Sequence, residues 1–269
     1  MTELILFPGG RSGSYLIPNT VTVIGENAFN GCTGLTSVTI PNTVTAIGED
    51  AFWCCYGLTS IEVDAKSPAY ASWNGVLFNK NLTELIRFPG GRFGRYLIPN
   101  TVTAIGGCAF AACVGLTSVT IPNTVTAIGS GAFQYCVGLI SVTISNTVTA
   151  IGGYAFYGCS GLKEVYYGTT NPIAGNINIF SSDTYTDATL YIATGGVQNA
   201  MTTNPWKNFV NIKEKEFSGI EKVIADNDLD APVEIYNING VKAGDSTEGL
   251  APGFYIKRQG SKTEKIVIR

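Results

Sequence analysis

A repeat with a period of about 23 residues, which is a length typical of stacked-coil repeats, is the strongest constraint on what this chain can fold into. Copies of a motif that begins Ile-Pro-Asn-Thr-Val-Thr, one of them with Ser in place of Pro, start at Ile17, Ile40, Ile98, Ile121 and Ile144. The spacing between neighbouring copies is constant, except for one longer step from Ile40 to Ile98. A fixed period is typical of a solenoid, because one coil cannot bury its apolar side without its neighbours. The sequence therefore predicts stacked coils interrupted by one longer unit.

The longer unit is repeated as well. The segment Thr2–Thr20 nearly matches Thr83–Thr101, and the two are offset by one long and one short step of the repeat. We therefore expect the chain to begin partway through a long repeat, so the lack of a secretory signal at its start carries no information. Within the unit, two apolar runs flank Asn79-Lys80-Asn81 and predict a β-hairpin or a tight coil.

The residue types within one repeat predict which side chains point inward. Leu35, Val38 and Ile40, followed by Asn42, fit the leucine-rich pattern L-x-x-L-x-L-x-x-N. The alternation of apolar and hydroxyl residues predicts a short strand with one face inward, and stacked coils would join such strands into a parallel sheet. We expect the recurring asparagine to be buried and to bond backbone groups of the turn. It stands at Asn19, Asn42, Asn100, Asn123 and Asn146.

Phenylalanine and cysteine recur at fixed repeat positions and predict the core. We expect the phenylalanines to stack along the solenoid axis as a spine. Because free cysteine behaves as a small buried hydrophobe, we expect the periodic cysteines to be buried and reduced, although an exported protein could instead use disulfides. The phenylalanines are Phe29, Phe52, Phe110, Phe133 and Phe156, and the cysteines are Cys32, Cys55, Cys113, Cys136 and Cys159.

Composition excludes several classes of function. The chain has no histidine, which removes Ser-His, Cys-His and histidine–metal chemistry. A net charge of −3 argues against nucleic-acid binding, and no apolar run is long enough to span a bilayer. Asp226, Asp228 and Asp230 alternate like calcium ligands but lack the later glycine and glutamate, so a solvated linker is favoured. We predict no enzyme, no metal and no cofactor.

Charge density marks a domain boundary near Ser218-Gly219. Charged side chains are much denser after this point than before it, and the repeat has already ended. Residues 218–269 alternate with period two around turn signals such as Asn239-Gly240, which predicts a small β-sandwich. Residues 1–217 are predicted to form the solenoid, with its last part, from about residue 166, closing the open end.

The repeat resembles the BspA-like leucine-rich repeats of bacterial surface proteins. The resemblance rests on the pattern IPNTVTAIG, AF, C, GL and SV, and on the segments NGVLFNKN and LIRFPGG, and covers residues 1 to about 165. Residues 185–216 resemble the cap of such solenoids, in which Leu190 and Ile192 would extend the sheet and Trp206 and Phe209 would cover its end. The resemblance implies a mostly β, right-handed leucine-rich repeat solenoid.

The tail carries a second resemblance. Its segments VEIYNINGVK and LAPGFYIK are similar to the C-terminal sorting-type domain of exported Bacteroidetes proteins, a small β-sandwich. Together the two resemblances imply an extracellular or cell-surface adhesion protein that binds a host extracellular-matrix protein or a glycan. A structural stalk without a ligand of its own is the alternative, and the recurring Thr-Val-Thr also allows ice binding.

The outward positions of the predicted strands form the candidate binding surface. This face is rich in hydroxyl groups and poor in the aromatic and arginine anchors of strong interfaces, so we expect weak binding that many copies strengthen. Its residues are Ser37, Thr39, Ser60, Glu62, Ser118, Thr120, Ser141, Thr143, Glu164 and Tyr166. A candidate basic cluster for a sulfated glycan comprises Arg87, Arg92 and Arg95.

Overall fold

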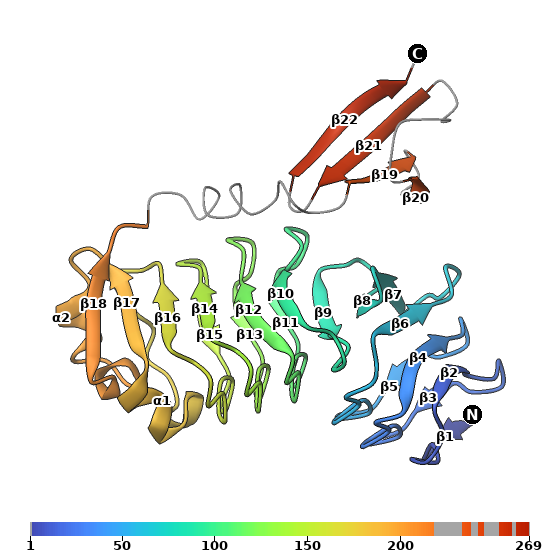
Figure 1. The fold of residues 1–269 in the computed structure, drawn as a ribbon, viewed down its shortest axis with the longest axis horizontal. Coiled ribbons are helices and arrows are strands. Elements are labelled where there is room, and N and C mark those ends of the chain that lie inside the picture. Colours follow the sequence, from blue (N-terminus) through green and yellow to red (C-terminus); the bar gives the residue numbers. More distant parts are fainter. Residues whose placement is uncertain (1, 218–232, 238–241, 245–252, 260–261, 269) are drawn as a thin grey trace. The chain divides into compact units, whose positions relative to one another are not determined.

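The protein consists of two compact units, residues 1–216 and 217–269. The computed structural model describes residues 2–217, 233–237, 242–244, 253–259 and 262–268. The first unit is a row of stacked coils with strands on two opposite walls (Figure 1). The predictions of a mostly β chain and of a solenoid with coils of about 23 residues are confirmed.

The longer strands form one wall of the solenoid, in two parallel sheets. The first sheet contains, in order, β2 (Gly13–Leu16), β4 (Leu35–Ile40) and β6 (Ser60–Val63). The second contains β10 (Gly94–Leu97), β12 (Leu116–Thr120), β14 (Ser141–Ile144), β16 (Glu164–Tyr167), β17 (Thr189–Ala193) and β18 (Asn211–Lys215). The register pairs identical repeat positions, as in Val119 with Val142. These valines are fully buried, so the residues that alternate with them face outward.

Short strands form the opposite wall. One sheet contains β1 (Glu3–Leu4), β3 (Val23–Ile24) and β5 (Ala46–Ile47). The other contains β15 (Ala150–Ile151), β13 (Ala127–Ile128), β11 (Ala104–Ile105), β9 (Glu84–Arg87), β8 (Val76–Asn79) and β7 (Tyr70–Trp73). The antiparallel pairing of β8 with β9 confirms the hairpin around Asn79–Asn81. A second hairpin, β7–β8, turns at Asn74-Gly75, where both residues have positive φ, as the tight turns of two-residue hairpins require.

The phenylalanine spine is confirmed and is longer than the sequence pattern predicted. The ring centres of Phe110 and Phe133 lie 4.7 Å apart and those of Phe133 and Phe156 lie 5.0 Å apart, and the rings are nearly parallel. Phe29 and Phe52 stack at 5.1 Å. Rings from the long units and from the cap extend the two stacks, at Phe7, Phe88 and Phe180.

The prediction that the recurring asparagine is buried is wrong. Asn19, Asn100, Asn123 and Asn146 are exposed in the turns, and Asn42 is half-buried. The threonine that follows the asparagine makes the bond to the neighbouring coil instead. Its hydroxyl donates to a carbonyl of the preceding coil in three of the repeats, at 2.7–2.9 Å: Thr43 to Val21, Thr124 to Val102 and Thr147 to Val125.

Two arginines join the coils on either side of the long unit. The buried apolar residues form two clusters, one from Phe7 to Ile61 together with Leu77, and one from Val76 to Phe209. Arg87, only 5% exposed, spans the junction: its Nη2 donates to the carbonyls of Phe52 (2.8 Å) and Ala111 (3.0 Å) and its Nη1 to that of Cys108 (2.6 Å). Arg92 donates to the carbonyls of Thr59 and Asn74.

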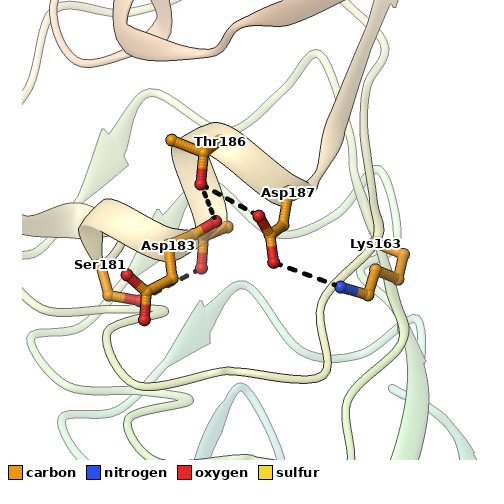
Figure 2. Close-up of polar contacts among 6 residues, drawn as sticks. Lys163, Ser181, Asp183, Thr186 and Asp187 are labelled. Atoms are coloured by element: carbon orange, nitrogen blue, oxygen red, sulfur yellow. Dashed lines mark hydrogen bonds and ion pairs between the residues drawn. The ribbon is translucent and has the colours of Figure 1, made fainter.

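The solenoid ends in a cap built from short helices. These are η1 (Ile177–Ile179), α1 (Ser182–Asp187), α2 (Val197–Ala200) and η2 (Trp206–Asn208). Trp206 is fully buried, and its Nε1 donates to the carbonyl of Ile173 at 2.8 Å. Figure 2 shows Asp187 of α1 reaching Lys163 of the last coil. This 3.6 Å ion pair joins two exposed side chains and therefore adds little stability.

The described strands of the second unit form one antiparallel sheet. Its order is β20 (Lys242–Gly244), β19 (Val233–Asn237), β21 (Gly253–Gln259) and β22 (Lys262–Ile268). The second sheet of the predicted β-sandwich is not among the described residues, so the sandwich stays a prediction. The acidic run at 226–230 also lies outside the described residues.

Replacing Phe133 with Ala tests the spine. The ring is fully buried between Phe110 and Phe156, so its loss should leave a cavity and lower the free energy of unfolding by about 3–5 kcal/mol. Phe93→Ala is the matched control, because Phe93 is 82% exposed, and we expect a change within about 0.5 kcal/mol. Urea denaturation measures both. Equal effects of the two substitutions would contradict the stacked spine.

Replacing Arg87 with Leu tests the junction. Leu6 occupies this position in the first long unit, so the residue is compatible with the backbone there. At position 87, however, the substitution removes the N–H donors of the Phe52 and Ala111 carbonyls and one of the two donors of the Cys108 carbonyl, and we expect a loss of about 3 kcal/mol or more. Arg95→Leu should change stability by less than about 0.5 kcal/mol, since Arg95 is exposed. A denaturation midpoint for Arg87→Leu that matches the Arg95→Leu value would refute the role of Arg87.

Candidate binding surfaces

The structure places the ten predicted surface residues in two rows on the outer face of the longer strands. All ten are exposed or half-buried. One row runs through Ser37 and Ser60 in the first sheet and Ser118, Ser141 and Glu164 in the second. The other runs through Thr39 and Glu62, and then Thr120, Thr143 and Tyr166. The rows are interrupted between β6 and β10, and their role in binding stays a prediction.

The cap extends both rows and adds aromatic residues to them. Tyr191 pairs with Tyr166 across β16 and β17, and the two rings stack at 4.8 Å. Lys215 places its Nζ 4.2 Å from the centre of the Tyr166 ring, a cation–π contact. Partial burial and the bond to Glu164 raise the pKa of Tyr166 above its ordinary value, so the phenol stays neutral. Tyr191 lies beyond residue 165, where the repeat pattern quoted from the sequence ends, so that pattern did not predict this pair.

The Thr-Val-Thr rows on the opposite wall are explained by bonds within the chain. The second threonine of each motif donates its hydroxyl to a carbonyl of the preceding coil, as in Thr126 to Thr103 at 3.3 Å and Thr149 to Thr126 at 3.2 Å. Because these hydroxyl protons already have acceptors, the recurring threonines do not need an external ligand to account for them.

The predicted basic cluster does not form on the surface. Arg87 is buried in the junction, and Arg92 is half-buried with its guanidinium bonded to backbone carbonyls. Only Arg95 is exposed, on the outer face of β10 beside Ser118. The long unit breaks the regular ladder of coil-to-coil bonds, and Arg87 and Arg92 supply donors there, which is why they do not join Arg95 in an exposed basic cluster.

A row of four aromatic side chains, which the sequence analysis missed, crosses the turns of several coils. Tyr135 contacts Trp53 on one side and Tyr157 on the other, both with ring centres 6.3 Å away and nearly perpendicular planes. Tyr154 contacts Tyr157 at 5.5 Å. We call Trp53, Tyr135, Tyr154 and Tyr157 the aromatic row. The signal in the sequence was the variable positions on either side of the Ala-Phe pair of each repeat.

Small residues allow the aromatic row to form. Two coils lie between those of Trp53 and Tyr135, and they have small or compact residues here, Pro89 and Gly90 in the long unit and Ala111 and Ala112 in the next coil, so the two rings can meet. Tyr135 packs against Gly158, where a Cβ atom would lie 2.5 Å from its ring. Tyr135 itself has a φ of 58°, a left-handed conformation that glycine adopts most easily.

The five periodic cysteines are buried and free, as predicted. The structure adds a bond that packing alone did not suggest, because each thiol points at the carbonyl of the spine phenylalanine in the preceding coil. The shortest such contacts are Cys55 to Phe29 (2.9 Å), Cys136 to Phe110 (3.0 Å) and Cys159 to Phe133 (3.1 Å). Burial raises the pKa of Cys55 from 9.0 to about 12, and burial also raises the pKa of Cys113 and Cys136.

Replacing Cys55 with Ala should change how the free energy of unfolding depends on pH. The raised pKa means that the unfolded chain loses its thiol proton near pH 9 while the folded chain keeps it to about pH 12. The stabilisation by Cys55 is therefore complete below about pH 9 and is lost as the pH rises toward 12. Urea denaturation should show that the advantage of the wild type over Cys55→Ala shrinks between pH 8 and about pH 11. An advantage that stays constant would contradict a buried, neutral thiol.

Among the residues that the structure describes, no group of three His, Cys, Asp or Glu side chains could hold a metal ion. Within the same residues, no helix is long and apolar enough to cross a membrane.

Solved structures with a similar fold come from bacteria. A leucine-rich repeat protein from Eubacterium ventriosum is 28% identical, with a TM-score of 0.59 over 67% of this chain and 48% of its own. A leucine-rich cell surface protein from Faecalibacterium prausnitzii is 26% identical, with a TM-score of 0.54 over 78% of this chain and 61% of its own. The present chain therefore spans about half to three-fifths of these proteins. A comparison with curated proteins finds no match.

The repeats themselves match a family model. The model describes the BspA-type leucine-rich repeat region, and six copies of it cover residues 11–91 and 87–191, which is more than half of the chain. The matched copies include both the regular coils and the β8–β9 hairpin of the long unit. The chain belongs to the BspA-type leucine-rich repeat family.

Proposed function

We propose that this chain is a non-enzymatic adhesion protein of the cell surface that binds host macromolecules through the outer face of its longer strands. The observation that carries the proposal is the register of the sheet, which repeats the same outward positions from β10 to β18 on a rigid backbone. Repeated, equally spaced side chains suit extended ligands and surfaces that display many copies. The family and the cell surface protein of F. prausnitzii support an extracellular location.

Tyr166 and Tyr191 are the anchors of the proposed surface. The hydroxyl side chains of the earlier strands offer hydrogen bonds that compete poorly with water, whereas a stacked tyrosine pair offers apolar area and fixed geometry. Aromatic residues dominate the binding energy of most protein interfaces. We therefore expect a single copy of the chain to bind weakly and the C-terminal end of the sheet to contribute most of the affinity.

Biolayer interferometry against immobilised collagen, laminin and vitronectin tests the proposal. The monomeric full chain should bind at least one of them weakly, and beads that carry many copies should bind about 100-fold more tightly. The double substitution Tyr166→Ala/Tyr191→Ala should weaken binding about tenfold. Tyr56→Ala, which removes an exposed tyrosine away from this face, should leave it unchanged. Equal losses of affinity in the double variant and in Tyr56→Ala would contradict the assignment of the binding surface.

A spacer that holds other domains away from the cell is the second candidate. The stacked coils, joined by Arg87 at the long unit, and the hydroxyl-rich face of the earlier strands favour it, because a stalk needs rigidity and solubility but no anchors. Failure of the bead-bound chain to capture any of the three matrix proteins would favour the spacer. For residues 217–269, we propose the sorting or anchoring role that the resemblance of the tail implies, and deletion of these residues should then reduce surface display in a producing bacterium.

A further inference from the structure

Three consecutive coils of the solenoid carry no charged side chain. Residues 96–162 contain no Asp, Glu, Lys or Arg, and the whole chain has no histidine. The surface of β12, β14 and the turns between them therefore consists of hydroxyl, amide, aromatic and aliphatic groups. An ionic ligand would find no partner for its charge on these coils, so electrostatic complementarity favours a neutral one.

The aromatic row lies mostly on these uncharged coils. Tyr135 and Tyr154 are 44% and 45% exposed, and Trp53 and Tyr157 are half-buried. Glu49 and Asp50 precede Trp53 in its turn and are the acidic groups that lie next to the row in sequence. Amide side chains lie next to two of the other rings: Gln134 precedes Tyr135 in sequence, and the side chain of Asn178 contacts the Tyr154 hydroxyl at 3.5 Å.

The backbone conformation at Tyr135 is a second observation that favours a function for the aromatic row. This position has positive φ in all five coils, which fill it with Gly31, Cys54, Ala112, Tyr135 and Gly158. Tyrosine in the left-handed region is unfavourable relative to glycine, because its Cβ atom crowds the backbone. Tyr135 is the largest side chain at this position, and it is half exposed and in contact with two other rings, which points to a use outside the core.

We propose that the aromatic row is a binding site for a neutral polysaccharide. The apolar C–H faces of sugar rings pack against aromatic rings, and their hydroxyl groups bond amides and phenols, which are the groups present here. The row crosses several coils along the solenoid axis, which suits a chain of sugars better than a single one. This inference names a ligand class and a second surface for the proposed binding protein, and so rests on that function.

Affinity electrophoresis of the full chain tests the site. Native gels would contain mannan, laminarin, galactomannan or xyloglucan as neutral probes, and heparin as the charged probe. We expect retardation in at least one neutral gel and none in heparin. Tyr135→Gly should weaken the apparent affinity about tenfold, while its fold is preserved because glycine suits the positive φ. Tyr157→Ala should act in the same direction, and thermal melting would verify that both variants fold.

Val137→Thr is the matched control. Val137 is exposed two residues beyond Tyr135, and it would be buried by a docked protein or a second copy of the chain but is not needed to stack a sugar. Its affinity for the polysaccharide should equal that of the wild type. Unchanged mobility in all four neutral gels would overturn the proposal, as would full retention by Tyr135→Gly. A wild-type dimer that Tyr135→Gly converts to a monomer in sedimentation analysis would also overturn it, because the row would then be a self-contact.

The two assays separate this inference from the proposed function. Binding to a matrix protein that depends on Tyr166 and Tyr191, without retardation by any neutral polysaccharide, would leave the adhesion role in place and remove the carbohydrate site. Retardation that depends on Tyr166 and not on Tyr135 would place the sugar on the sheet face, which overturns the aromatic row as its site.

Discussion

The structure depends on each coil finding its hydrogen-bond and stacking partners in the next one. The amide of a spine phenylalanine donates to the alanine carbonyl of the following coil, as in Phe110 to Ala132 and Phe133 to Ala155, both at 2.7 Å. The same phenylalanine stacks on the next ring, and its carbonyl accepts a thiol from the following coil. Because one residue takes part in three contacts between coils, a change of period at any point would break all three together.

The long unit is the place where this arrangement is interrupted and repaired. The sheets on both walls stop there, and the buried side chains divide into two clusters. Arg87 restores contact because its planar guanidinium presents several donors, which reach one carbonyl of the preceding coil and two of the following one. A buried arginine is costly unless its donors are bonded; both Nη atoms of Arg87 are bonded and its Nε is not, so the three carbonyls offset part of the cost of burying it.

A core fixed in this way leaves the outward positions free to vary. The hydroxyl rows, the Tyr166–Tyr191 pair and the aromatic row all use positions that make no contact in the spine. Their side chains are held in register by the backbone beneath them, so a ligand meets a surface that is already ordered and loses little entropy in arranging it. This separation of core and surface allows the side chains of the outer face and of the turns to vary without a change in the repeat.

The sequence by itself determined the period, the parallel register, the phenylalanine spine and the buried cysteines, because each of these follows from a residue that recurs once in every repeat. Features that depend on a neighbour in space and not in the repeat were decided by the tertiary structure. Arg87 is buried because it donates to carbonyls that become its neighbours only when the coils stack. The recurring asparagines are exposed, and the threonines next to them make the hydrogen bonds to the backbone instead. Trp53 and Tyr135 are far apart in sequence, and they meet because the two coils between them carry small residues, Gly90 and the pair Ala111 and Ala112, which leave room for both rings.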